Sequence, residues 1–160
     1  MSTLQILLLT PGQCTREQLD QFHDLVISGK QVQEEGLSER IAGASLLGFA
    51  YLEDQLAGVA SVKNQKRSYV IGIFLKAKVP RLADAYQYEV GYAVTHNSFR
   101  RKGVSRSLIA QLMKSKPDTS FYATTKNDGM RELLIKSGFN KLGNSYQNAG
   151  GETLDLYVSK

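Results

Sequence analysis

A cluster of three cations stands immediately before a helical pattern in the stretch "SFRRKGVSRSLI", residues 98–109. Arg100, Arg101 and Lys102 are followed there by Gly103. A helix N-terminus carries partial positive charge and unpaired N–H donors, so acidic side chains are the usual residues at this place. A bound phosphate would reverse this balance, and glycine would let the backbone approach it closely. The stretch is therefore interpreted either as a phosphate-binding loop or as a solvated, basic helix start, and charge alone favours neither.

The distribution of charge along the chain adds a second indication. The formal net charge is +5, yet residues 1–60 hold three basic and eight acidic side chains, whereas residues 100–136 hold nine basic and three acidic ones. This asymmetry favours an anionic ligand on the second half. Because the cations are not interleaved with aromatic residues, nucleic acid is the less favoured ligand. The acids of the first half are typical of solvated helix faces, although they could also attract a cationic amine.

Cysteine and histidine offer little further chemistry. Cys14 is the single cysteine, which excludes an internal disulfide and fits a reducing cytoplasm. His23 and His96 are far apart and give no metal-ligand spacing, so no metal is expected. The apolar run near the N-terminus has no basic residue before it and is too short to span a bilayer. We expect a cytoplasmic protein without a membrane partner.

The elements that would position the cationic stretch follow from periodicity and turn signals. In the first half we expect a strand over 4–10, a helix that begins after a capping box at Thr15, a weaker helix over 31–44, and a β-hairpin around Glu53 and Asp54. The apolar run "YVIGIFLKAKVP", residues 69–80, is assigned to neither class. In the second half we expect strands over 88–94, 120–126 and 152–158, a helix after Gly103, and a helix over 127–139 capped by Asn127 or Asp128. This order predicts one mixed α/β domain over residues 1–160.

The cationic stretch resembles the pyrophosphate loop of the GNAT (Gcn5-related) N-acetyltransferases, whose consensus is [QR]-x-x-G-x-[GA]. Arg100, Gly103 and Ser105 occupy its three fixed positions, and Ser105 departs from the usual Gly or Ala. Further stretches resemble the second to fourth strands and a later helix of this family, in the same order over residues 45–145. They read "SLLGFAYLEDQLAGVASVK", "YEVGYAV" and "NDGMRELLIKSGF". The resemblance implies a mostly antiparallel central sheet, with splayed fourth and fifth strands, flanked by helices.

The resemblance also implies acetyl-CoA as the acyl donor. In the family, the pantetheine arm lies between the splayed strands and pairs with backbone groups, which here belong to Ala93, Val94 and Thr95. Asn127 would hydrogen-bond near the thioester arm. The residues that would hold the pyrophosphate are Arg100, Arg101, Lys102, Gly103, Val104, Ser105 and Arg106.

Glu89 is the candidate general base. An amine with a pKa near that of lysine is protonated at pH 7, so a base must take its proton before it can attack a thioester. Glu89 lies eleven residues before Arg100, which matches the position of a family glutamate with that role. The alternative is a glutamate that only orients water or pairs with a basic residue.

The group that would protonate the leaving thiolate is not given by the resemblance. The family commonly has a tyrosine seven residues after the asparagine, and Leu134 stands there. Tyr122 and Tyr146 lie on neighbouring predicted elements and could replace it, or each could be an ordinary packing aromatic. A thiol with a pKa like that of cysteine also needs little help to leave.

These observations predict an N-acetyltransferase that moves an acetyl group to a primary amine of a small molecule or peptide, by direct transfer in a ternary complex. The alternatives are a non-catalytic CoA-binding or regulatory module and a protein that modifies nucleic acid. A homodimer is one option for its assembly. Residues 64–87, basic at both ends and apolar in the middle, are longer than a hairpin and are expected to contribute to the choice of acceptor.

Overall fold

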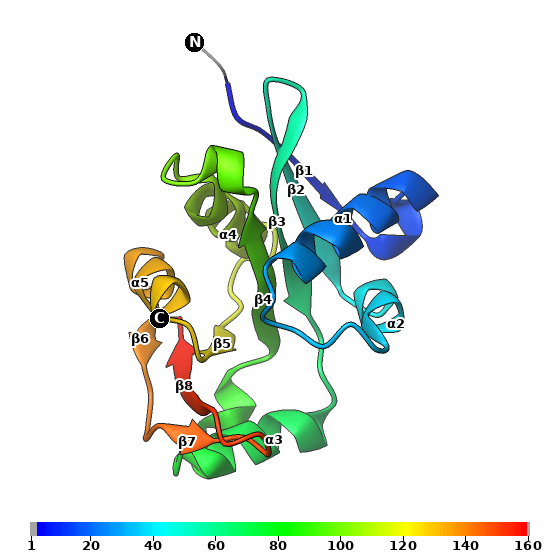
Figure 1. The fold of residues 1–160 in the computed structure, drawn as a ribbon. Coiled ribbons are helices and arrows are strands. Elements are labelled where there is room, and N and C mark those ends of the chain that lie inside the picture. The colour runs from blue at the N-terminus through cyan, green and yellow to red at the C-terminus, as the bar shows by residue number, and fades with distance from the viewer. Residues whose placement is uncertain (1–2, 160) are drawn as a thin grey trace. The chain divides into compact units, whose positions relative to one another are not determined.

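The computed structural model describes residues 3–159, which form an α/β fold around one sheet (Figure 1). The strands are β1 (Gln5–Leu9), β2 (Leu46–Leu52), β3 (Gln55–Lys63), β4 (Tyr88–Thr95), β5 (Phe121–Thr125), β6 (Asn140–Lys141), β7 (Tyr146–Gln147) and β8 (Thr153–Val158). The helices are α1 (Arg16–Ser28), α2 (Leu37–Ala42), α3 (Arg67–Lys76), α4 (Val104–Lys114) and α5 (Asp128–Lys136), with the short 3-10 turns η1 (Pro11–Gln13), η2 (Pro80–Ala85) and η3 (Asn97–Phe99).

The sheet is mostly antiparallel. Its strand order is β1-β2-β3-β4-β5-β8-β6, and β7 pairs with β8. The pairs β1–β2, β2–β3, β5–β8, β6–β8 and β7–β8 are antiparallel, whereas β4 and β5 are parallel. The described β4–β5 ladder has the pairs Tyr88↔Phe121 and Glu89↔Tyr122, while β4 itself continues to Thr95. The resemblance implies splayed fourth and fifth strands, and the described ladder between β4 and β5 holds these two pairs.

The chain divides into two compact units. Unit 1 consists of residues 1–63 and 90–116, and unit 2 consists of residues 64–89 and 117–160. The expectation of one domain over residues 1–160 stays a prediction. None of the helices within residues 3–159 is long and apolar enough to cross a membrane.

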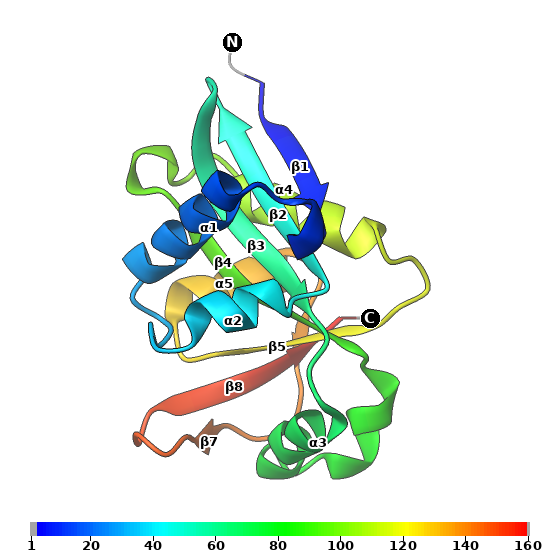
Figure 2. The same ribbon diagram turned by 90° about the vertical axis from the view of Figure 1, so that its right-hand side faces the viewer.

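Unit 1 is built on the β1–β2–β3 meander. The β2–β3 hairpin closes through Glu53 and Asp54, whose φ angles of 54° and 63° are those of a tight two-residue turn. Helices α1 and α2 cover one face of these strands and α4 covers the other (Figures 1 and 2). The approach of α4 is close, because a Cβ on Gly58 of β3 would lie 2.6 Å from Val104 of α4. The core under α1 and α2 includes Phe22, Val26, Leu37, Ile41, Leu47, Phe49 and Val59.

Unit 2 is built on the β5–β8 pair. The buried face of α3 packs with one face of this pair, and the amide of Phe121 donates to Ser159 Oγ at 2.8 Å at the end of the ladder. The core of this unit consists of Val70, Ile73, Phe74, Ala77, Ala83, Tyr122, Leu156 and Val158. Helix α3 therefore packs against Tyr122, which pairs with Glu89 across the β4–β5 ladder.

Most of the expected elements are confirmed. The structure has the strands near residues 4–10, 88–94, 120–126 and 152–158, and the hairpin at Glu53 and Asp54. The capping box at Thr15 also forms, with the amide of Gln18 donating to Thr15 Oγ1 at 3.1 Å. The start of α5 is capped by Asn127.

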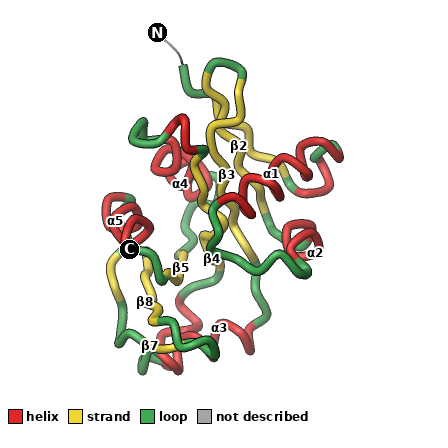
Figure 3. Tube along the Cα trace, viewed as in Figure 1, coloured by secondary structure: helices red, strands yellow, loops and turns green. Residues whose placement is uncertain are grey.

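The helix expected over 31–44 is wrong in extent, since α2 covers Leu37–Ala42 and a loop precedes it (Figure 3). Gly36 precedes α2 with a φ of 74°, and a left-handed residue cannot continue a right-handed helix. Arg40 instead donates to the loop carbonyls of Gln33 at 2.6 Å and Glu35 at 2.8 Å. The unassigned apolar run is mostly α3. Strands β6 and β7 were not expected, because two residues carry no periodic signal.

Candidate functional site

The cationic stretch forms a tight turn between β4 and α4. His96 closes β4 and caps η3, where the amide of Ser98 donates to His96 Nδ1 at 3.1 Å. Arg101 and Gly103 then adopt left-handed φ angles of 65° and 74°. A Cβ on Gly103 would meet open space, so the need for glycine comes from its φ angle and not from crowding.

The N-terminus of α4 is left without the groups that usually satisfy it. No side chain caps it, and its first turn holds no acidic residue. By contrast, α1 has Thr15 and Glu17 at its start, and α5 has Asn127 and Asp128. The first turn of α4 therefore has neither a capping side chain nor an acidic residue of its own.

The cations next to this helix start also lack carboxylate partners within the described residues. Arg100, Arg101, Lys102 and Arg106 are exposed, and none of them forms an ion pair with a carboxylate among the residues that the structure describes. Exposed cations next to unsatisfied amide donors form an arrangement that suits a phosphate group.

Ser105, the departure from the family motif, has its hydroxyl held by Thr95. The two hydroxyl oxygens lie 2.6 Å apart, joining the end of β4 to the first turn of α4. The extra hydroxyl is thus tied to the protein.

Strand β4 has an irregularity that the sequence did not predict. Tyr92 has a φ of 53°, in the left-handed region that a bulky residue rarely adopts. Its ring lies 3.7 Å from Lys63 Nζ, measured to the centroid, and contacts Phe22 edge to face at 6.3 Å. These contacts hold the backbone in place just before Ala93, Val94 and Thr95, the three residues expected to pair with pantetheine, all of which are partly exposed. No local sequence signal announces this kink, because tyrosine has no preference for a left-handed φ.

Glu89 is fixed inside unit 2. It is only 5% exposed, and its Oε1 accepts a hydrogen bond from Gln65 Nε2 at 3.1 Å. It pairs with Tyr122 across the β4–β5 ladder, so the two side chains leave the same face of the sheet. The predicted base and one predicted acid are therefore neighbours.

Tyr122 is an unsuitable proton donor. It is fully buried and packs edge to face on Phe74 at 5.7 Å. Its hydroxyl has no hydrogen-bond partner of acceptable geometry within residues 3–159. Burial first, and then the nearby charge of Glu89, raises the pKa of the Tyr122 phenol well above its usual value. A phenol shielded from solvent in this way is better described as a packing residue beside Glu89.

Tyr146 on β7 keeps part of its surface exposed. Burial, followed by the charges of Glu89 and Asp155, raises the pKa of Tyr146 to about 12, while a hydrogen bond with Thr124 opposes the shift. Leu134, at the position of the family tyrosine, is fully buried. Of the two predicted tyrosines, Tyr146 is the one that keeps part of its surface exposed.

A polar cluster that the sequence analysis missed lies next to Tyr146 in the chain. Asp155 on β8 accepts hydrogen bonds from Ser145 and, at 2.8 Å, from Arg131 Nε. Lys141 Nζ donates to Ser145 Oγ at 2.9 Å and lies 3.4 Å from the Asp155 carboxylate. The residues are spread over α5, β6, β8 and a turn, so no spacing along the sequence marks the cluster.

Asn127 acts as the N-cap of α5. Its side-chain Oδ1 accepts a hydrogen bond from the backbone amide of Met130 at 3.0 Å, and its backbone amide donates to Thr125 Oγ1 at 3.0 Å. The side-chain oxygen is thus engaged in the helix start. The expected role of Asn127 near a thioester arm stays a prediction.

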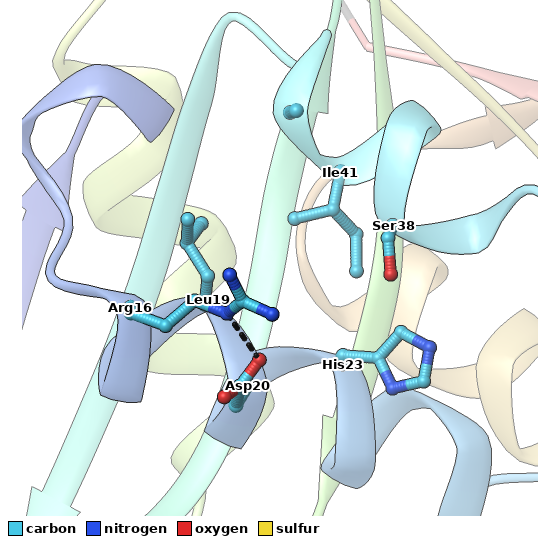
Figure 4. A pocket seen from close by; sticks show the side chains of 7 residues that line it. Arg16, Leu19, Asp20, His23, Ser38 and Ile41 are labelled. Atoms are coloured by element: carbon cyan, nitrogen blue, oxygen red, sulfur yellow. Dashed lines mark hydrogen bonds and ion pairs between the residues drawn. The ribbon is translucent and has the colours of Figure 1, made fainter.

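A pocket of about 250 Å³ in unit 1 lies between α1 and α2 (Figure 4). Leu19 and Ile41 supply apolar lining, while the Arg16–Asp20 ion pair, 3.3 Å long, stands at 89% and 63% side-chain exposure. None of the site residues expected from the sequence lines this pocket. We therefore do not assign the predicted chemistry to it.

Comparison with solved structures defines the class of fold. ElaA of Escherichia coli is 13% identical with a TM-score of 0.70, over 99% of this chain and 100% of that one. An acyl-CoA N-acyltransferase from Pseudomonas aeruginosa is 12% identical with a TM-score of 0.71, over 99% and 100%. A GNAT family acetyltransferase from Elizabethkingia anophelis, with acetyl-CoA bound, is 13% identical with a TM-score of 0.64, over 98% and 97%.

These similarities extend over nearly the whole chain and share one architecture. No protein-family model matches the sequence, and no curated protein is similar to it at the sequence level. The chain has the fold of the GNAT acetyltransferases, and the resemblance indicated by the sequence motifs is confirmed at the level of the fold. Identities this low establish the fold and not the substrate.

Proposed function

We propose that this protein is an N-acyltransferase that uses acetyl-CoA as donor and a primary amine as acceptor. The observation that carries the proposal is the start of α4, where an uncapped helix N-terminus lies beside four cations without carboxylate partners. The GNAT fold, in which structural neighbours are acetyltransferases, supports the same activity. A reducing cytoplasm, suggested by the lone Cys14, is its proposed location.

The residues present fit the diphosphate of coenzyme A. Gly103 leaves open space over the turn, the first-turn amides of α4 offer donors, and Arg100 to Lys102 with Arg106 offer positive charge. The backbone of Ala93 to Thr95 would hold the pantetheine arm. When bound, acetyl-CoA supplies an acyl group already activated as a thioester.

Glu89 is proposed to accept a proton from the acceptor amine. A primary amine is protonated at pH 7 and becomes a nucleophile only when that proton is removed. The carboxylate is buried, and the hydrogen bond from Gln65 fixes one of its oxygens. A held carboxylate of this kind can take a proton directly or through one water molecule.

Tyr146 is proposed to return a proton to the departing sulfur. Its pKa of about 12 keeps the phenol protonated at pH 7, and its partial exposure allows access. This step needs little assistance because a thiol with a pKa near 8.5 is already a good leaving group. Loss of Tyr146 should therefore cost less activity than loss of Glu89.

The decisive test replaces the proposed base. Glu89→Gln should lower kcat by about 10²- to 10⁴-fold, the usual contribution of a general base, while coenzyme A binding measured by calorimetry stays unchanged. Glu132→Gln, a change of the same type on the exposed side of α5, is the matched control and should leave both quantities unchanged. Full activity of Glu89→Gln across the pH range would exclude Glu89 as the base.

A second candidate is a CoA-binding module without catalysis, which the fully buried Leu134 at the family tyrosine position favours. The wild-type protein should be tested against polyamines, amino acids, aminoglycosides and peptide N-termini. Binding of coenzyme A without acyl transfer to any of these amines would support the module and count against the enzyme.

A further inference from the structure

Helix α3 is apolar on two sides. One side, formed by Val70, Ile73 and Phe74 and continued by the C-cap residue Ala77, is buried in the core of unit 2. On the other side Ile71 and Leu75 are 44% and 58% exposed, and their spacing of four residues places them one turn apart on one face. Leu82 of η2 adds a third aliphatic side chain at 42% exposure. Core packing accounts for the first side and leaves the second unexplained.

The two elements that carry the exposed aliphatic side chains, α3 and η2, are joined by Arg67. Arg67, in the first turn of α3, donates to the carbonyl of Ala83 at 2.9 Å and to that of Tyr86 at 3.3 Å. It also pairs with Asp84 at 3.0 Å. These three contacts clamp η2 and the residue after it against α3.

Exposed cations lie near these side chains in the sequence. Lys66, Lys76, Lys78 and Arg81 are exposed, and within residues 3–159 none of them forms an ion pair. Asp84 is the sole acidic residue between 64 and 88, and Arg67 binds it. We call Ile71, Leu75 and Leu82 together with these four cations the α3 surface.

We propose that the α3 surface docks on an anionic lipid bilayer. Exposed aliphatic side chains in a segment that also carries four exposed cations match the boundary between acyl chains and negatively charged headgroups. A second copy of the chain fits poorly, because a symmetric contact would bring the same cations together. A protein partner also fits less well, because lysine is depleted at protein interfaces and aromatic residues with arginine are enriched. The surface thus gives the chain a membrane partner that the sequence analysis did not expect.

Sedimentation with sucrose-loaded vesicles tests this proposal. Wild-type protein should bind vesicles that contain phosphatidylglycerol, should bind those of phosphatidylcholine alone weakly, and should lose binding as salt rises. Ile71→Ser with Leu75→Ser should weaken binding by about tenfold or more, since two aliphatic side chains no longer enter the bilayer. Lys76→Glu with Lys78→Glu should weaken it by a similar factor.

The matched controls carry the same changes elsewhere. Ile135→Ser removes an aliphatic side chain of α5 that is 59% exposed, and Lys114→Glu with Lys136→Glu makes the same change of charge on α4 and α5. Both should bind anionic vesicles nearly as wild type does. Circular dichroism and thermal unfolding establish that each variant is folded.

Three results would overturn the proposal. The first is no binding of wild type to phosphatidylglycerol vesicles at low salt, and the second is an equal loss in the α3 and control charge variants. The third is a dimer in sedimentation velocity that Ile71→Ser with Leu75→Ser abolishes, which would assign the surface to a second copy. Acyl transfer is not measured, so this outcome is independent of the proposed enzymatic function.

Discussion

The hydroxyl of Tyr122 is a buried polar group without a satisfactory partner, and it lies beside the carboxylate proposed as the base. A buried hydroxyl that lacks a hydrogen bond costs free energy, because it has lost its contacts with water. This free-energy cost distinguishes Tyr122 from Tyr146, although the sequence alone presents both as equal candidates for the proton donor.

Tyr122→Phe should therefore leave the free energy of unfolding unchanged or raise it by up to about 1 kcal/mol. Tyr146→Phe is the comparison, because Tyr146 keeps part of its surface exposed, so this change should alter stability by less than about 1 kcal/mol while it lowers kcat. Urea unfolding followed by tyrosine fluorescence measures both. A loss of about 1 kcal/mol or more in Tyr122→Phe would mean that the Tyr122 hydroxyl donates a hydrogen bond to Glu89.

At the scale of elements, the start of α4 combines a left-handed glycine, uncapped amides and free cations. Gly103→Ala should cost about 1 kcal/mol of stability, since alanine is strained at a φ of 74°. It should also weaken coenzyme A binding, because the strain is relieved by movement of the amides that hold the diphosphate.

The matched control for this prediction is Gly72→Ala on α3. Gly72 lies within a helix and a Cβ there meets open space, so alanine should raise stability by up to about 1 kcal/mol without any effect on coenzyme A. Isothermal calorimetry and thermal unfolding of both variants make the comparison. Unchanged coenzyme A affinity in Gly103→Ala would show that the turn does not hold the cofactor.

The elements also show what could be predicted from the sequence. The turn before α4 was found because its charges contradict the usual preference at a helix start, and such a contradiction is visible in a short stretch. Helix α3 was not assigned, because amphipathic periodicity requires a polar face and α3 has apolar residues on both sides. The kink at Tyr92 depends on Lys63 and Phe22, which are distant in the sequence. Residues that act only through tertiary contacts leave no local pattern.

At the scale of the whole molecule, the fold redistributes the charge asymmetry of the sequence. The acidic residues of the first 60 positions fall in unit 1 together with the cationic turn, and the basic segment around α3 falls in unit 2. Each unit thus has its own cationic feature, with a diphosphate as the proposed ligand of one and anionic lipid as that of the other. The binding of either anionic ligand should weaken with increasing salt, because salt screens the attraction between opposite charges.

The net charge of +5 becomes larger as carboxylates take up protons, so acid should destabilise the whole protein. Asp155 is expected to contribute to this. Burial raises the pKa of its carboxyl, but hydrogen bonds from Ser145 and Arg131 and the charge of Lys141 outweigh burial and leave the pKa below its usual value. A carboxyl whose pKa is lower in the folded state stabilises the fold above its unfolded-state pKa, and this contribution disappears as the pH falls through the folded-state pKa.

Asp155→Asn should therefore lose about 2 kcal/mol of stability at pH 7, since the amide leaves Arg131 and Lys141 without their buried counter-charge. The difference from wild type should persist down to pH 5 and shrink at lower pH, as Asp155 takes up a proton first in the unfolded chain and then in the folded protein. Urea unfolding at pH 7, 5, 4 and 3 measures this difference. Glu152→Gln, which removes an exposed pair with Lys126, is the control and should change stability little at any of these pH values. A gap between wild type and Asp155→Asn that stays constant down to pH 3 would show that the carboxylate charge does not stabilise the fold.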